Sequence, residues 1–353
     1  MINLKKVGLT ALAGSLAAVT ANAGELSVSG AANLTYTTGS GLKTNTVGAD
    51  RDVKFSGSGD LDNGWSVSFH TTMKDDFTVS SSATVITMGS MGSIGVGSGG
   101  GTNVNGGYDE TDPRAYEENS DAGGQSAANY VGSAVDSNAI VYQWPGMDVM
   151  GVSLSGGLEY SLQADNTDAN DGGQNATSDT WGDGYGIGLT ADTNTGLVLG
   201  AYYATRDNKN PNDVADVNDE TSMSGFVNYS MGPVSVGYQE FYVDSGLTQS
   251  AAIATTAAKT VGTTAGQFDG SNMSIAFNLN DDLSISYAET EETHDDRTAT
   301  QTNDVTQEAE SLQIAYSMGS MSIKAYTTEI TNPNYDEDAA NLKKNEIALG
   351  LAF

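Results

Sequence analysis

The 353-residue sequence contains no cysteine, which excludes disulfide frameworks, thiolate nucleophiles and metal sites with cysteine ligands. Basic residues are also scarce: 14 Lys and Arg stand against 45 Asp and Glu, for a formal net charge of −31. A chain of this charge is a poor partner for nucleic acid and for anionic surfaces. Nucleic acid is therefore not an expected partner.

Long hydrophobic runs are missing as well. No segment approaches the roughly 18 to 20 apolar residues that a membrane-spanning helix needs. The short apolar stretch 7–19 follows two lysines and precedes a small-residue A-x-A site that ends at Ala23. These features in this order predict a cleaved export signal over 1–23, which leaves Gly24 as the first residue of a single mature domain, 24–353. If the mature chain enters a membrane, it does so without helices.

What the sequence does contain is a period of two. From Leu26 to Phe353, apolar residues alternate with polar or small ones in short runs, as in Leu283-Ser284-Ile285-Ser286-Tyr287. Such alternation indicates strands with one apolar face. Sixteen strands are predicted, at 25–37, 51–59, 65–74, 83–89, 94–98, 138–144, 149–160, 184–192, 197–206, 221–230, 233–243, 269–279, 283–292, 308–317, 320–329 and 342–353.

The predicted connections alternate between tight turns and longer loops. The tight turns are rich in Gly, Asn, Asp and Pro and lie at 60–64, 89–92, 145–147, 193–196, 231–233, 280–282 and 318–320. The longer loops lie at 38–50, 75–82, 99–137, 161–183, 207–220, 244–268, 293–307 and 330–341. Alternation without exception is typical of an up-and-down barrel with one trimmed rim, and it places both chain ends at the short-turn rim.

The fold class predicted from these patterns is all-β: a 16-stranded antiparallel transmembrane β-barrel with short periplasmic turns and long extracellular loops. A mean hydropathy of −0.30 agrees with this fold, because only alternate residues of a barrel strand face lipid. A barrel of this strand number also leaves an aqueous interior. The alternative is a soluble β-sandwich, such as a surface adhesin without channel activity, which would not require loop lengths to alternate.

Several local features resemble the general porins of Gram-negative bacteria, and the acidic porins of alphaproteobacteria in particular. They are the mature start Gly24-Glu25-Leu26-Ser27-Val28-Ser29-Gly30, a long Gly- and acid-rich third loop, turns of the Met-Gly-Ser kind, and a last strand that ends at Phe353. The resemblance implies an outer-membrane homotrimer in contact with lipopolysaccharide. It also implies that the barrel assembly machinery reads Phe353, and that ions and small hydrophilic solutes diffuse through the barrel.

The resemblance further implies that the third loop, 99–137, folds into the barrel and narrows it. Its acidic residues are then the candidate constriction residues, accompanied by the single base Arg114. Carboxylates in a narrow, partly dehydrated passage favour cations, so we expect a preference for cations. The candidates are Asp109, Glu110, Asp112, Glu117, Glu118 and Asp121.

Porins of this type set basic wall residues opposite the loop. Strand parity turns Lys54, His70 and Lys74 toward the lumen, and Lys324 and Lys344 likewise. Arg51 lies near the same part of the wall, although parity points it outward unless it lies above the lipid belt.

Other chemistry has little support in the sequence. His70 and His294 are the only neutral bases, and neither has a visible nucleophile arrangement, so no enzyme and no catalytic residue is predicted. The segment Gly95–Gly100 fits a dinucleotide pattern but precedes no helix. No cofactor is expected, although acidic loops can bind Ca²⁺ weakly through oxygen ligands. The candidate Ca²⁺ ligands are Asp165, Asp168 and Asp171.

Overall fold

The structure is a computed structural model. It describes residues 24, 26–40, 46–98, 101–133, 135, 139–162, 164, 181–209, 218–247, 253–297 and 303–353. Over these ranges, no helix is long and apolar enough to cross a bilayer.

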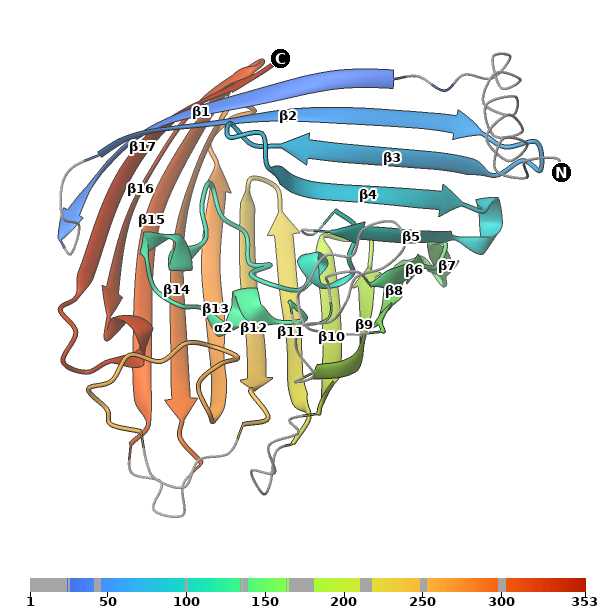
Figure 1. Cartoon of the computed structure of the whole chain (residues 1–353). Helices are drawn as coiled ribbons and strands as arrows, with labels where there is room; N and C mark the ends of the chain where they lie inside the picture. The colour runs from blue at the N-terminus through green and yellow to red at the C-terminus, as the bar shows by residue number, and fades with distance from the viewer. Residues whose placement is uncertain are drawn as a thin grey trace, which may run out of the picture.

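The described chain is almost entirely β-structure, and every strand pairs antiparallel with its neighbours (Figure 1). The strands are β1 Leu26–Ser40, β2 Thr46–Asp60, β3 Ser66–Met73, β4 Val79–Thr87, β5 Ser93–Ser98, β6 Ile140–Gln143, β7 Met147–Val149, β8 Val152–Ser161, β9 Trp181–Asp192, β10 Leu197–Asn208, β11 Glu220–Met231, β12 Val234–Asp244, β13 Gln267–Asn278, β14 Leu283–Asp295, β15 Val305–Met318, β16 Met321–Thr331 and β17 Leu342–Ala352. Short helices are η1 Gly89–Met91, η2 Asn105–Gly107, η3 Asn119–Ala122, α2 Ala127–Tyr130 and η4 Pro333–Tyr335.

The sheet closes on itself, because β1 pairs with β2 on one side and with β17 on the other. Both β6 and β7 pair with β8, so they are two parts of one strand position. The barrel therefore has 16 strands, as predicted. Phe353 and Gly30 exchange two backbone hydrogen bonds of 2.7 and 2.9 Å, so the last residue meets the first part of β1 at the short-turn rim.

The interruption between β6 and β7 corrects one predicted turn. We expected 145–147 to reverse the chain, but the reversal lies at Met150 and Gly151, which have φ values of 56° and 84°. Gln143 pairs with Gly157, and Met147 pairs with Leu154. One extra residue therefore lies on the first strand, which is a β-bulge. Pro145 has no N–H to donate to the ladder, and this explains a bulge at that place.

Loop lengths do not alternate as strictly as predicted. The first two long loops were expected at 38–50 and 75–82, but β1 runs to Ser40 and β2 begins at Thr46, while β3 ends at Met73 and β4 begins at Val79. Polar and glycine residues such as those of 46–50 read as loop in the sequence. In the barrel they continue the ladder, because their pairing partners on β1 fix the extended backbone.

The barrel interior is only partly open. Between the β10–β15 wall and the segment that follows β5, buried apolar side chains form a dry cluster that includes Tyr108, Val131, Phe241, Phe268 and Tyr335. The strand number predicted an aqueous interior, and the resemblance implied that the third loop folds into it and narrows it. A long segment folded inward carries its own apolar residues, however, and these pack on the wall and exclude water from that side.

The contribution of the Phe353 ring to barrel closure can be tested at Gly30. A Cβ atom at Gly30 would lie 2.3 Å from the Phe353 ring, so Gly30→Val must displace that ring and weaken the β1–β17 junction. We expect the folded, fast-migrating form in SDS electrophoresis to convert to the unfolded form at a lower temperature than wild type. Ala32→Val, on the same face of β1, is the matched control; equal transition temperatures for both variants would contradict the proposed role of this contact.

Candidate functional site: the infolded loop

The segment between β5 and β6, here called the infolded loop (101–133), runs inside the ring of strands (Figure 1). The predicted infolding of the third loop is thus observed. Its first half approaches β9–β12, where Tyr108 lies, and its turn reaches β15–β17, where Tyr116 lies. It then returns through η3 and α2 toward β11. The loop thus covers the inner face of one side of the barrel.

Amide side chains of the wall satisfy the backbone of this loop. Gln239 accepts a hydrogen bond from the N–H of Thr111 at 3.1 Å and donates to the carbonyls of Tyr108, at 2.8 Å, and Asp109. Gln313 likewise accepts a hydrogen bond from the N–H of Tyr116 at 2.8 Å and donates one to the carbonyl of Glu117 at 2.6 Å. Buried backbone groups need such partners. The two glutamines therefore replace a neighbouring strand.

Short polar side chains of the wall have the same role along the rest of the loop. Ser274 donates to the carbonyl of Pro113 at 2.8 Å, and Ser286 accepts from the N–H of Ala115 at 2.9 Å. Ser222 accepts from the N–H of Gly132, also at 2.9 Å. These inward positions alternate with the lipid-facing apolar residues of each strand, so the polar half of the strand pattern includes the binding surface for the loop.

Two buried glutamates hold the two ends of the loop. Glu159 accepts a hydrogen bond from the N–H of Val104 at 2.9 Å and another from the hydroxyl of Tyr202. Glu292 accepts hydrogen bonds from the N–H of Ala127 at 2.8 Å and from the hydroxyl of Tyr335. Each glutamate side chain is about 1 % exposed. Buried N–H groups need such acceptors, so these contacts fix where the loop begins and ends its inward course.

Aromatic packing fixes the first half of the loop against the wall. The Tyr108 ring stacks on Tyr202 with centroids 5.4 Å apart, and its hydroxyl accepts a hydrogen bond from Thr190 at 3.0 Å. A Cβ atom at Gly188 would lie 2.3 Å from the Tyr108 ring. Gly188 is therefore needed for close approach of the ring to β9, which explains one of the many glycines of the strands.

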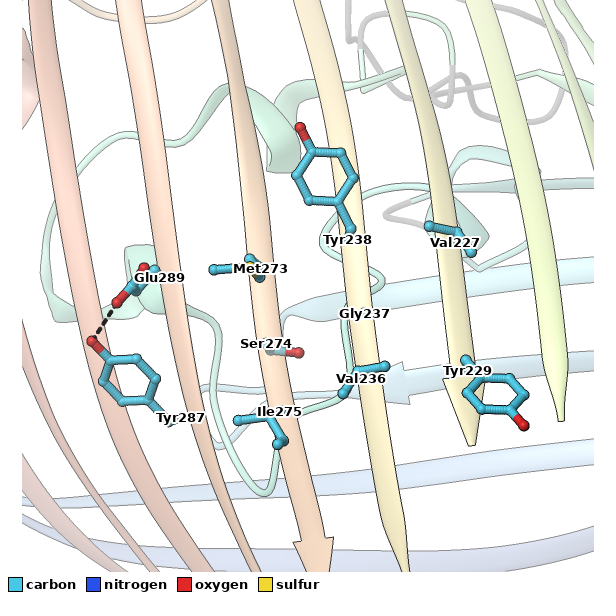
Figure 2. A pocket seen from close by; sticks show the side chains of 10 residues that line it. All are labelled: Val227, Tyr229, Val236, Gly237, Tyr238, Met273, Ser274, Ile275, Tyr287 and Glu289. Carbon is cyan, nitrogen blue, oxygen red and sulfur yellow. Dashed lines mark hydrogen bonds between the residues drawn. The ribbon is translucent and has the colours of Figure 1, made fainter. Parts of the chain in front are cut away.

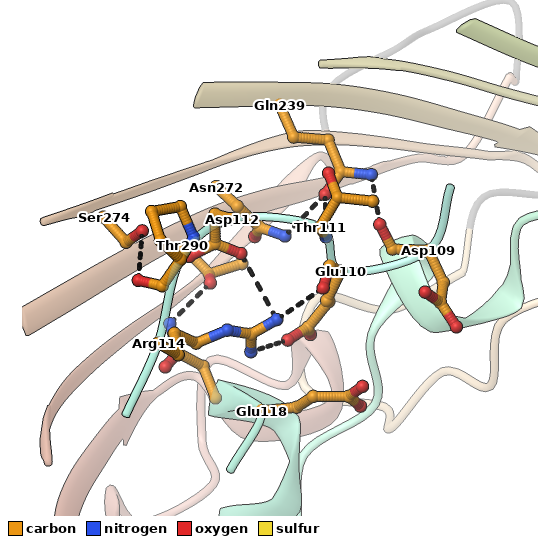
Figure 3. Close-up of polar contacts among 12 residues, drawn as sticks. Asp109, Glu110, Thr111, Asp112, Arg114, Glu118, Gln239, Asn272, Ser274 and Thr290 are labelled. Carbon is orange, nitrogen blue, oxygen red and sulfur yellow. Dashed lines mark hydrogen bonds and ion pairs between the residues drawn. The ribbon is translucent and has the colours of Figure 1, made fainter. Parts of the chain in front are cut away.

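The acidic residues of the loop are not equivalent (Figure 3). Glu110 and Asp112 both form ion pairs with Arg114, the latter at 3.3 Å, and all three side chains are almost fully buried. Burial raises the pKa of Glu110, against the opposing effect of Arg114. We infer that these two carboxylates hold the loop in shape, and that little of their charge is offered to a passing ion.

Three other acidic residues of the loop are more accessible than Glu110 and Asp112. Asp109, Glu117 and Glu118 are partly exposed, and Glu118 accepts a hydrogen bond from Asn129 at 2.7 Å. Burial, together with the nearby Glu118 carboxylate, raises the pKa of Asp109 to about 6. Asp121 lies in η3. The role of these residues in a constriction stays a prediction.

Two of the predicted wall bases lie on the part of the wall that the tip of the loop contacts. The ammonium group of Lys324 lies 4.8 Å from the centre of the Tyr116 ring, and that of Lys344 lies 5.5 Å from the Tyr326 ring. Lys344 is also 3.7 Å from Glu346, which accepts a hydrogen bond from the Tyr116 hydroxyl. Both lysines thus face inward, where their charge is directed at the loop tip.

Lys54 belongs to the opposite wall. Thr37 on β1 faces inward, because it donates to Glu346 at 3.0 Å. Ser29 shares that face of β1 and lies opposite Lys54 on β2, so Lys54 also faces inward, as parity predicted. His70 lies opposite Ser56, two residues from Lys54, and these side chains line one small hollow of the inner wall.

Arg51 and Lys74 lie beside the connection between β3 and β4. Arg51 is directly opposite Ala32, on the outward face of β1, and its guanidinium is 3.2 Å from Asp75 with about 65 % of the side chain exposed. Lys74 is exposed and donates its backbone N–H to Thr78 at 2.9 Å. Both residues are near the rim, and Arg51 points away from the lumen.

Metal binding receives no support from the part of the chain that is described. No group of three or more His, Cys, Asp or Glu residues there could hold a metal ion. The candidate Ca²⁺ ligands Asp165, Asp168 and Asp171 lie outside the described residues.

On the outer face, an apolar groove of about 370 Å³ runs over β11–β14 (Figure 2). Tyr238, Met273 and Ile275 contribute to it, and the Tyr287 hydroxyl donates to Glu289 at 2.7 Å. These are outward positions of the strands, which a transmembrane barrel presents to lipid. The groove is therefore part of the lipid-facing belt and separate from the loop.

The residues that hold the loop were absent from our predictions. Glu159, Gln239, Glu292 and Gln313 occupy inward positions of predicted strands, where pore-lining polar residues are also expected. Nothing in strand parity separates the two roles. The available signal was a long polar side chain, glutamine or glutamate, at an inward position of a strand.

The chain shares its overall fold with several known proteins. A family model described as Gram-negative porin matches residues 8–266. Among solved structures, Salmonella typhi OmpF in complex with daunomycin has a TM-score of 0.66 at 13 % identity and covers 94 % of this chain and 98 % of its own. In-vitro folded OmpT of Vibrio cholerae gives 0.62 at 9 %, covering 94 % and 98 %. A mutant of Rh. blastica porin gives 0.56 at 14 %, covering 93 % and 100 %. No curated protein sequence matches.

The role of Gln239 can be tested by Gln239→Leu, which keeps the size of the side chain and removes three hydrogen bonds to the loop backbone. Each buried group left without a partner costs about 1–3 kcal/mol, so we expect faster amide hydrogen exchange around residues 108–111. Gln143→Leu changes an exposed inward glutamine and serves as control. Unchanged exchange in the Gln239 variant would show that the loop is held by other contacts.

Proposed function

The chain belongs to the Gram-negative porin family, and on that premise we propose that its outer-membrane channel for small solutes prefers cations. We assign the rim with the long loops to the cell exterior. We further propose that the protein is a homotrimer without catalytic activity, that the assembly machinery recognises its last strand, and that its outer face contacts lipopolysaccharide.

The charge distribution around the infolded loop carries the proposed cation preference. Arg114 is occupied by Glu110 and Asp112, and Lys344 lies beside Glu346. We propose that the partly exposed acids Asp109, Glu117 and Glu118 face the passage and carry its effective negative charge. Carboxylates in a confined, poorly screened passage raise the local concentration of cations.

The raised pKa of Asp109 adds a pH dependence. A carboxyl group with a pKa of about 6 is mostly protonated below that pH and charged above it. The negative charge at the passage therefore grows as pH rises through about 6, and cation preference should grow with it. Lys54, which faces inward on β2, opposes this field from the other wall.

The first test is conductance of the purified protein in planar bilayers. We expect stepwise conductance and, in a KCl gradient, a reversal potential that indicates cation preference. The preference should increase between pH 5 and pH 7. Anion preference would contradict the proposed role of the loop acids, and absence of any conductance would favour a surface protein without a channel.

A second test separates the two classes of loop acid. Neutralising Asp109 and Glu118, as Asp109→Asn and Glu118→Gln, should reduce cation preference and abolish most of its change near pH 6. The matched variant Asp112→Asn should have a smaller effect on the reversal potential, because Asp112 faces Arg114. Equal permeability ratios in wild type and the double variant would place the selective charges elsewhere.

A further inference from the structure

Glu292 and Gln307 lie directly opposite each other on β14 and β15, and each contacts two separate segments. Glu292 accepts the N–H of Ala127 from the infolded loop and, at 2.5 Å, the hydroxyl of Tyr335 from the connection between β16 and β17. Gln307 donates to the carbonyl of Gln125 at 2.6 Å. It also accepts the N–H of the residue before Tyr335 at 2.7 Å. One cross-strand pair thus joins the same two segments twice.

The outer connection is itself held firmly at this point. Tyr335 is fully buried, and its ring meets Phe268 edge-on with centroids 5.1 Å apart. Its backbone carbonyl accepts a hydrogen bond of 2.6 Å from Lys259, which belongs to the connection between β12 and β13. Burial lowers the pKa of Lys259, whereas Asp336 and Glu337 favour its charged form. The two outer connections and the infolded loop therefore form one packed unit.

The backbone of the outer connection is shaped for this insertion. Asn332, Asn334 and Tyr335 all have positive φ, at 49°, 59° and 56°. Left-handed conformations are unfavourable for residues with a side chain, and for tyrosine more than for asparagine. The conformation persists because the Tyr335 side chain is anchored inside the barrel. A free surface loop of this sequence would not require it.

Resting on the proposed function, we propose that Tyr335 is a positioning residue for the passage. Through Glu292, and with Gln307 beside it, the connection 332–341 sets where the second half of the infolded loop lies. A substitution in the connection 332–341 therefore alters the ion selectivity of the passage by moving the infolded loop, although the connection itself does not line the passage. Tyr335 itself need not contact a permeating ion for this effect.

The test uses Tyr335→Phe, which removes one hydroxyl and keeps the ring on Phe268. The hydroxyl gives Glu292 one of its two hydrogen bonds, and such a bond contributes about 0.5–1.5 kcal/mol, so amide exchange around 125–128 should accelerate about 2- to 10-fold. The reversal potential should shift while the fast-migrating folded form in SDS is retained. Tyr287→Phe removes the same hydroxyl–glutamate bond on the outer face of β14, and should change neither quantity.

Gln307→Met gives an independent measurement, because it removes the bonds to Gln125 and to the outer connection while leaving Tyr335 intact. Faster exchange around 125–128 and a shifted reversal potential are expected again. Two folded variants with wild-type exchange would overturn the proposal. Faster exchange with an unchanged reversal potential would also overturn it, since the loop would then be held but not positioned for selectivity. Amide exchange can be measured whether or not the protein conducts ions. A wild-type protein without conductance would therefore contradict the proposed channel function, while the exchange data would still test the contact between Tyr335 and the loop.

Discussion

The need to satisfy the backbone of a non-repetitive segment inside a barrel organises this molecule. The infolded loop carries its own N–H and C=O groups into a space where it pairs with no strand, and each group left without a partner there would cost free energy. Gln239, Gln313 and the buried glutamates Glu159 and Glu292 provide these partners. The main role of the inward face of the β8–β15 wall is therefore to bind the infolded loop.

This constraint also explains the asymmetry of the interior. Polar contacts bring the loop onto one side of the barrel, and its apolar residues, such as Val131, then pack with Phe241 and Phe268 into a dry cluster. Water and solutes are left with the rest of the interior. Strand number sets how much space a barrel encloses, but the loop decides which part of that space conducts.

The barrel was predictable from the sequence because its signals are local. Alternation of side chains and the turn residues gave the strand number, the closing strand and the inward direction of Lys54, Lys324 and Lys344. The bulge at Pro145 was misread, since proline and glycine mark turns and bulges alike. The partners of the loop acids could not be predicted, because whether Asp112 faces water or Arg114 depends on how the loop folds against strands far away in sequence.

The same reasoning separates charge count from electrostatic effect. A net charge of −31 describes the chain, whereas the field in the passage depends on which carboxylates are already paired. Arg114 takes up two of the loop acids within the loop itself, and the raised pKa of Asp109 makes a third depend on pH. Of the many acidic residues in the sequence, only a few loop carboxylates therefore act on ions in the passage. Any contact that moves the loop also moves these carboxylates.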